Sequence, residues 1–336
     1  MNKAPMKMLF ITLLIMSTLI STSSNNWLGV WMGLEINLLS YIPLITYNKN
    51  KNLNFSGIKY FIIQSMASVV LIMSIISITI NDSMDNNYLI SIMSISILTK
   101  IGAAPMHFWF PEIMEQLDWN NCMLLMTWQK IAPMIILSYI TPNENLMNLF
   151  IMTSAITGAI LGLNQISLRL ILAYSSINHI AWMISALNNN LMIWWSYFLI
   201  YSLMTILISS SFKSNNIFSI NEAFLSKNSN KINKINLMMT MLSLGGMPPL
   251  LGFLPKWLLI QEMVINLSYL TLSVLIISSL ITLYFYLKLF LSAGMILAQE
   301  NKWNLMNYSL STTEILSFSV NLFTTMGLTL SMMITY

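Results

Sequence analysis

The sequence predicts an all-α polytopic membrane protein, and three observations lead to this prediction. Of the 336 residues, 56% are hydrophobic and only 8% are charged, against roughly 25% charged residues in an ordinary soluble domain. Apolar stretches close to the roughly 20 residues that cross a bilayer recur along the whole chain. The lysines gather in alternate connections between these stretches, which is typical of proteins whose loops alternate between the two sides of a membrane.

Eleven stretches are apolar enough and long enough to be transmembrane helices. The first begins with two lysines, as a signal peptide does, but no small-residue cleavage site follows it, so we expect a retained span. The eleven predicted spans cover residues 4–22, 26–46, 58–80, 88–107, 121–140, 146–165, 168–187, 191–211, 236–262, 268–293 and 313–335.

The connections between the spans predict how the chain is oriented. If they alternate sides, the charged residues in the connections on one side are all acidic, namely Asp82, Asp85 and Glu144. The other side carries Lys3, Lys7, Lys49, Lys51, Lys59, Arg169, Lys213, Lys227, Lys231, Lys234 and Lys302. Because positively charged loops stay on the side of synthesis, we expect the N-terminus there and the C-terminus opposite. The longest connection, 212–235, is interpreted as a solvated loop, with anionic lipid binding as the alternative.

The cysteine and histidine content gives no basis for a redox cofactor. The single Cys122 cannot form an internal disulfide or hold an iron–sulfur cluster, and His107 and His179 lie far apart without a haem or nucleotide motif. We therefore expect neither a cofactor nor a metal site in this chain, and no nucleic acid as a partner. The single Arg169 and the 29 methionines suggest an AT-rich organelle genome.

Five ionisable residues stand out by their depth within predicted spans. At about 1.5 Å per residue, Glu35, Lys100, Lys130 and His179 lie roughly 13 to 18 Å from the starts of their helices, close to the bilayer midplane. Lys256 lies about two-thirds of the way through its span. A charge at the centre of a helix costs about 2.5 to 3.5 kcal/mol on insertion, so we interpret these residues as functional. The alternatives are buried, paired structural ions or lysines that snorkel from tilted helices.

Each of the three lysines stands beside a helix breaker. Pro105 follows Lys100 by five residues, and Pro133 follows Lys130 by three. Lys256 follows a run that consists of Gly245, Gly246, Pro248, Pro249, Gly252 and Pro255. Irregular backbone inside a bilayer is tolerated where protein or water satisfies it, and in transporters it marks ion sites. The breaks and the charges together predict one hydrated interior path.

The two histidines each allow two interpretations. His107 lies seven residues after Lys100, on the same face if the helix continues, and it either extends a proton relay towards the surface or marks the helix end. His179 lies on a polar stripe with Tyr174, Ser175 and Asn178. It is either a packing histidine with satisfied nitrogens or a proton relay.

The positions of the lysines predict an internal repeat. Lys100 falls on the fourth predicted span and Lys256 on the ninth, each beside a break. Five-helix units related by an odd number of spans are inverted relative to each other. We therefore predict a single transmembrane domain over 1–336 with two inverted repeats, about 4–140 and 146–293, followed by a C-terminal helix at about 313–335.

Four stretches of the sequence resemble a known family. They are "WMGLEINLLSYIPL" around Glu35, "LTKIGAAPMHFWFPEI" with Lys100 and His107, "TWQKIAP" with Lys130, and "LSLGGMPPLLGFLPKW" with Lys256. In this order they resemble the antiporter-like membrane subunits of respiratory complex I, and among these the short, eleven-span animal mitochondrial form. The resemblance covers nearly the whole chain.

The resemblance implies a core membrane-arm subunit that contributes to proton translocation across the mitochondrial inner membrane. NADH oxidation and ubiquinone reduction would take place in partner subunits, which would hold the flavin, the iron–sulfur clusters and the ubiquinone. Partners would include neighbouring antiporter-like chains and membrane lipids such as cardiolipin. The N-terminus would lie in the matrix and the C-terminus in the intermembrane space.

The resemblance also implies roles for the buried residues. Glu35 and Lys100 would form a charge pair. Lys130 would be the connecting residue, and Lys256 would be the exit-side or neighbour-facing protonatable group. Related chains carry an acid in place of Lys256, so the direction of proton exit stays open. Two alternatives differ in class from this function: an independent cation/proton antiporter, and a purely structural membrane subunit.

Overall fold

The computed structural model describes residues 3–47, 51–80, 86–140, 143–220, 222 and 231–297. The described residues are helical apart from their connections and one isolated bridge between Ser167 and Ser219. The chain divides into two compact units, Met1–Ser154 and Ala155–Tyr336. The predicted all-α class is confirmed.

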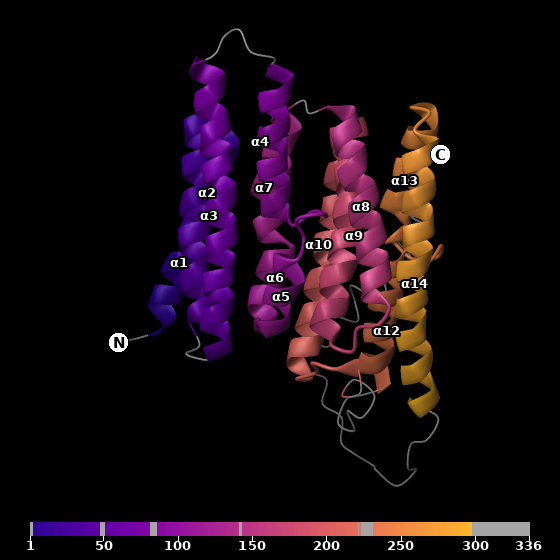
Figure 1. Cartoon of the computed structure of the whole chain (residues 1–336). Coiled ribbons are helices and arrows are strands. Elements are labelled where there is room, and N and C mark those ends of the chain that lie inside the picture. The colour runs from indigo at the N-terminus through magenta and orange to yellow at the C-terminus, as the bar shows by residue number, and fades with distance from the viewer. Residues whose placement is uncertain are drawn as a thin grey trace. The chain divides into compact units, whose positions relative to one another are not determined.

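The first unit is built from helices that lie side by side (Figure 1). Long apolar runs form the first three, of which the second continues through Pro43, whereas the fourth is cut short and followed by shorter segments. The helices are α1 (Lys3–Ser23), α2 (Trp27–Thr46), α3 (Lys51–Ile80), α4 (Asn86–Ile101), α5 (Trp109–Gln116), α6 (Trp119–Met126) and α7 (Trp128–Tyr139). Helix α8 (Glu144–Gly162) runs across the boundary into the second unit.

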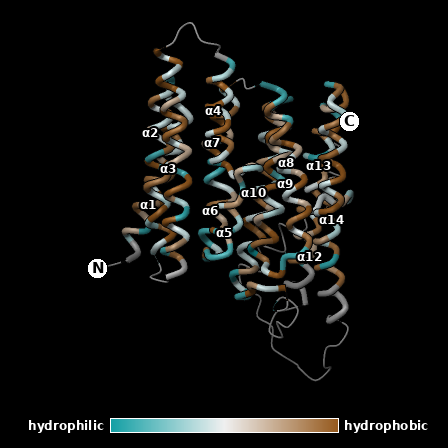
Figure 2. The backbone as a smooth tube through the Cα atoms, in the orientation of Figure 1, coloured by the Kyte–Doolittle hydropathy of each residue, from teal (hydrophilic) through white to brown (hydrophobic). Residues whose placement is uncertain are grey.

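The second unit repeats this pattern of long helices followed by a divided one. Its described helices are α9 (Leu168–Asn189), α10 (Leu191–Ser214), α12 (Lys231–Gly245), α13 (Phe253–Ile265) and α14 (Tyr269–Leu297). Helix α9 is buried along most of its length, whereas α14 presents apolar side chains outward, such as Leu280 at 61% exposure. Hydrophobic residues recur along α3 and along the coloured part of α14 (Figure 2).

The described part of the chain contains eight helices long and apolar enough to cross a membrane, and one shorter apolar helix within α4. Two predicted spans need correction: the span at 88–107 ends at Ile101, and the span at 236–262 is two helices, α12 and α13. The span at 121–140 corresponds to Trp119–Tyr139, with a local interruption at Thr127. The eleventh predicted span, 313–335, lies outside the described residues.

Candidate functional site

The first break in the helices follows Lys100. Gly102 has φ +84°, a left-handed conformation that glycine adopts without strain. The N–H groups of Gly102 and Ala103 both donate to the carbonyl of Leu98 at 3.1 Å, which closes the end of α4. Helix α4 therefore ends because of Gly102, and Pro105 lies in the turn that follows.

Three side chains satisfy the carbonyl groups around this break. A broken helix leaves such groups without intrahelical donors, and an unsatisfied group in a bilayer is costly. Gln64 Nε2 donates to the Lys100 carbonyl at 3.2 Å, and Trp109 Nε1 donates to the Thr99 carbonyl at 3.1 Å. Thr153 Oγ1 donates to the Ala104 carbonyl at 2.9 Å.

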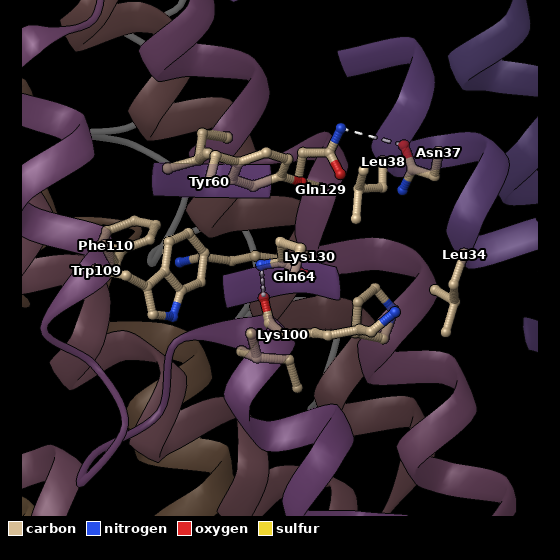
Figure 3. A pocket seen from close by; sticks show the side chains of 13 residues that line it. Leu34, Asn37, Leu38, Tyr60, Gln64, Lys100, Trp109, Phe110, Gln129 and Lys130 are labelled. Carbon is tan, nitrogen blue, oxygen red and sulfur yellow. Dashed lines mark hydrogen bonds between the residues drawn. The ribbon is translucent and has the colours of Figure 1, made fainter. Parts of the chain in front are cut away.

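Lys100 and Lys130 line the same cavity (Figure 3). Lys100 is 7% exposed and Lys130 only 2%. Gln64 and Gln129 supply amides to the lining, and Gln129 Nε2 donates to Asn37 Oδ1 at 3.1 Å. The cavity offers about 20 Å³ to the centre of a water molecule, which is enough for one water with polar partners.

Lys130 is placed by an interruption between α6 and α7. We expected Pro133 to break this helix, but α7 continues through Pro133, and the interruption lies at Thr127. A proline ring presses on the carbonyl four residues before it, so the distortion appears in the preceding turn. The Lys130 ammonium lies 5.5 Å from the centre of the Phe110 ring, on the helix that follows the first break.

Glu35 of α2 does not form a direct ion pair with Lys100. Among the described residues, no contact within 4.0 Å joins the two side chains, although Glu35 is close enough to act electrostatically on Lys100. The Ser68 hydroxyl of α3 donates to Glu35 Oε1 at 2.5 Å instead. The predicted charge pair is therefore separated in this structure.

The second break has the same hydrogen-bond pattern as the first. Gly246 has φ +85°, and the N–H groups of Gly246 and Met247 both donate to the carbonyl of Leu242, at 3.1 and 3.3 Å. The predicted breakers Gly245, Pro248 and Pro249 lie at the end of α12 and in the turn after it. Pro255 lies in the first turn of α13, where the missing N–H needs no partner, so it begins a helix rather than breaking one.

Lys256 closes the end of the helix before the break. Its side chain is 4% exposed, and Nζ donates to the Gly245 carbonyl at 2.9 Å. The Trp182 ring centre lies 5.8 Å from Nζ. The Lys256 side chain thus supplies a donor to the C-terminal end of α12, which carries partial negative charge.

His179 of α9 lies in the second unit, in a small cavity beside the second break. The cavity offers about 10 Å³ to a water centre, and its lining includes Tyr197, Tyr201, Ser243 and Pro255. His179 is 7% exposed, and its Nδ1 lies 2.8 Å from the Tyr197 hydroxyl. This contact can fix which ring nitrogen carries the proton.

His107 lies off the helical face on which we expected it. That expectation is wrong because α4 ends at Ile101, so His107 lies in the turn before α5. Its Nδ1 is 3.2 Å from the Pro105 carbonyl. The helix-end interpretation of His107 fits this placement better than a relay along α4.

The sequence interpretation missed Gln64, Ser68 and Tyr197. Gln64 is the one side-chain amide within the predicted span 58–80. Because a buried amide requires a hydrogen-bond partner, the sequence alone indicates a polar contact at Gln64. Nothing in the sequence distinguishes Ser68, because most serines of these helices bond only to the carbonyl one turn earlier, as Ser74 does to Leu71.

Comparisons with known proteins agree with this architecture. Residues 24–282 match the model of the family described as NADH:quinone oxidoreductase/Mrp antiporter, TM. The chain is 48% identical over 301 residues to NADH-ubiquinone oxidoreductase chain 2 of Locusta migratoria, covering 89% of this chain and 88% of the relative. It is 44% identical over 332 residues to the protein of the same name in Anopheles gambiae, covering 97% of each.

Two solved structures share the fold. A chain of respiratory complex I from Thermus thermophilus matches with a TM-score of 0.85 at 20% identity, covering 96% of this chain and 78% of that one. A chain of the Mrp complex from a Dietzia species matches with a TM-score of 0.76 at 12% identity, covering 96% and 75%. At these identities the likeness concerns the fold alone.

Proposed function

Because this chain belongs to the NADH:quinone oxidoreductase/Mrp antiporter family, and within it to the NADH-ubiquinone oxidoreductase chain 2 proteins, we propose that its buried lysines carry protons through the membrane arm of respiratory complex I. The chain is a multi-pass subunit of this proton-translocating NADH:ubiquinone oxidoreductase in the mitochondrial inner membrane. Its partners are other complex I subunits.

The observation that carries the proposal is the burial of three lysines beside interruptions in their helices. Lys100, Lys130 and Lys256 are each less than a tenth exposed, and a charged side chain deep in a bilayer costs about 2.5 to 3.5 kcal/mol. If a lysine only filled space, Leu or Met could replace it and would cost less to insert into the membrane. Leu or Met cannot replace a lysine that must gain and lose a proton.

In the first unit, proton transfer would involve Glu35, Lys100 and Lys130. When the Glu35 carboxylate approaches Lys100, Lys100 keeps its proton, because an opposite charge stabilises the ammonium. When the carboxylate moves away, burial favours the neutral amine and the proton leaves for Lys130. The two lysines line one cavity large enough for a water molecule, which would bridge them.

In the second unit, His179 and Lys256 are the proposed proton carriers. The order of transfer that we propose is Lys130, then His179, then Lys256. The Tyr197 contact would hold His179 in one tautomer, and the Gly245 carbonyl would hold the protonated Lys256. His107 is assigned no part in this relay.

The energy for transfer would come from redox chemistry in partner subunits. We assign the flavin, the iron–sulfur clusters and the ubiquinone to those subunits. The coupling would reach this chain as a rearrangement of charge in neighbouring antiporter-like chains.

The proposal includes an orientation and an internal repeat. The N-terminus would lie in the matrix and the C-terminus in the intermembrane space. The connection 212–235 would be a solvated loop, with anionic lipid binding as the alternative, and membrane lipids such as cardiolipin would be among the partners. The inverted repeats would span about 4–140 and 146–293. The shared hydrogen-bond pattern at Gly102 and Gly246 supports this division.

Co-migration tests the assignment to complex I. The chain is expected in the native-gel band that oxidises NADH, identified by mass spectrometry. Migration alone, with sodium-dependent proton transport by the isolated chain, would favour the independent antiporter, the second function suggested by the Mrp match.

Substitution of Lys256 tests the proton-carrying role. In complex I that carries Lys256→Met, we expect normal assembly and normal NADH oxidation by artificial acceptors, but reduced quinone-linked proton pumping. Lys288→Met is the control, because Lys288 is exposed on α14. Equal pumping by the two variants would support the purely structural subunit.

A further inference from the structure

Helix α3 carries two buried polar side chains that hold both members of the separated charge pair. Gln64 is 5% exposed and Ser68 only 2%, and four residues apart they lie on one face of the helix. Gln64 donates to the Lys100 carbonyl, and Ser68 donates to the Glu35 carboxylate. A helix without a charge at this depth therefore contacts both proposed proton carriers.

The Ser68 hydroxyl has two acceptors for its single proton. Its oxygen lies 2.5 Å from Glu35 Oε1 and 2.8 Å from the Ser65 carbonyl of its own helix. A hydroxyl has one O–H to donate and rotates to suit its partners. If Glu35 moves away, Ser68 turns back to the Ser65 carbonyl and no buried donor is left unsatisfied.

We propose that Ser68 is a positioning residue that holds the Glu35 carboxylate away from Lys100 and releases it reversibly, while Gln64 fixes the Lys100 end of α4. The inference rests on the proposed function of Glu35 and Lys100. Two observations carry it: the carboxylate is bonded to Ser68 rather than ion-paired with Lys100, and the alternative acceptor is already within reach.

The inference predicts the direction of a mutational effect. Without the Ser68 hydroxyl, Glu35 has Lys100 as its remaining charged partner and stays with it, so Lys100 keeps its proton. A hydroxyl–carboxylate bond is charge-assisted and about twice as strong as a neutral one. Its loss is expected to slow quinone-linked proton pumping on the order of tenfold.

The experiment compares serine variants in intact complex I. Ser68→Ala is expected to slow proton pumping, while NADH oxidation by artificial acceptors is unchanged. Ser74→Ala is the matched control, because Ser74 is buried on the same helix and its hydroxyl bonds to the Leu71 carbonyl. Ser68→Thr keeps the hydroxyl and is expected to restore pumping, which a loss of packing alone would not predict.

A cycle with Glu35→Gln separates positioning from packing. In the Glu35→Gln background, Ser68→Ala is expected to cause no further loss, since there is no carboxylate to hold. Equal pumping by Ser68→Ala and Ser74→Ala, or the same loss in both backgrounds, would overturn the inference. If Ser68→Ala does not assemble, Ser68→Cys, with similar volume and a weaker donor, is held to the same comparison.

Lys100→Met distinguishes failure of this inference from failure of the proposed function. Unchanged pumping by Lys100→Met would overturn the proposed function. Loss of pumping by Lys100→Met, together with normal pumping by Ser68→Ala, would overturn only the role of Ser68.

Discussion

Replacing Gly246 by alanine is expected to disable Lys256 without touching the lysine itself. A methyl group at Gly246 would lie 2.9 Å from Lys256 Nζ and 3.1 Å from its Cδ. The lysine would have to move, and its bond to the Gly245 carbonyl would be lost. Gly246→Ala should therefore reproduce the pumping defect of Lys256→Met.

The size of the effect follows from two contributions. Alanine at φ +85° costs about 1 to 2 kcal/mol, because its Cβ crowds the backbone in the left-handed conformation. Loss of a hydrogen bond to a charged group costs about 1.5 to 3 kcal/mol. Together they disfavour the observed geometry of the break by about 2.5 to 5 kcal/mol, enough to depopulate it in a two-state equilibrium.

The neighbouring Gly245 provides the control. A methyl group there would meet its nearest atom, Tyr286 Cδ2, at 3.4 Å, which is ordinary contact. The assay is the number of protons pumped per NADH oxidised in reconstituted vesicles. Gly246→Ala is expected to lower this ratio, and Gly245→Ala to leave it near normal.

Two outcomes would refute this reasoning. One is equal pumping by the two alanine variants. The other concerns Lys256→Ala, in which the ammonium is already absent. Gly246→Ala should then cost only the backbone contribution, about 1 to 2 kcal/mol, and an undiminished effect would mean that Lys256 is not what the methyl group displaces.

Three further predictions address the first break, the topology and a connecting loop. Gly102→Ala, at φ +84°, is expected to strain the backbone by about 1 to 2 kcal/mol without displacing a lysine, so its pumping ratio should exceed that of Gly246→Ala. Cysteines introduced at Glu144 and Lys213 are expected to react with impermeant reagents from opposite sides of oriented membranes, and labelling from one side would refute the span count. The Phe218 N–H holds the pKa of the Glu222 carboxyl below its usual 4.5. The contact should therefore persist above pH 4.5 and be lost as the pH falls through the lowered pKa. Hydrogen exchange at Phe218 measures this, and Glu222→Gln should remove the pH dependence.

The charges and breakers were predictable from the sequence because each violates the rule for a transmembrane helix. A lysine, or a glycine–proline run, inside an apolar span has few explanations. The sequence predicts the end of α4 less well, because it points to Pro105 as the breaker rather than to Gly102. The chain leaves the helix at the residue with positive φ, three positions earlier, which removed His107 from the face of Lys100.

The uncharged residues of the site could not be predicted for a different reason. Ser68 and Ser74 look alike in the sequence, and both bond to a carbonyl of their own helix. Only the packing of α2 against α3 brings Glu35 to one of them. Contacts between residues far apart in the chain decide which polar residue belongs to the site.

The matching hydrogen bonds at the two breaks also set a register between the two halves of the chain. Aligning Gly102 with Gly246 aligns Pro111 with Pro255, since both prolines follow their glycine at the same interval. Each half therefore has a glycine at the break of its divided helix and a proline at the same interval after it.

The lysines do not occupy matching positions in this alignment. In this register Lys100 corresponds to Leu244, and Lys256 corresponds to Glu112. Glu112 forms an ion pair with Lys59 at 2.7 Å, and its side chain is 55% exposed. The first half thus has its lysine before the break and an acid at the matching position after it, whereas the second half has a leucine before the break and its lysine after it. Two halves that are alike in backbone and unlike in charge would not exchange roles in the proposed proton transfer.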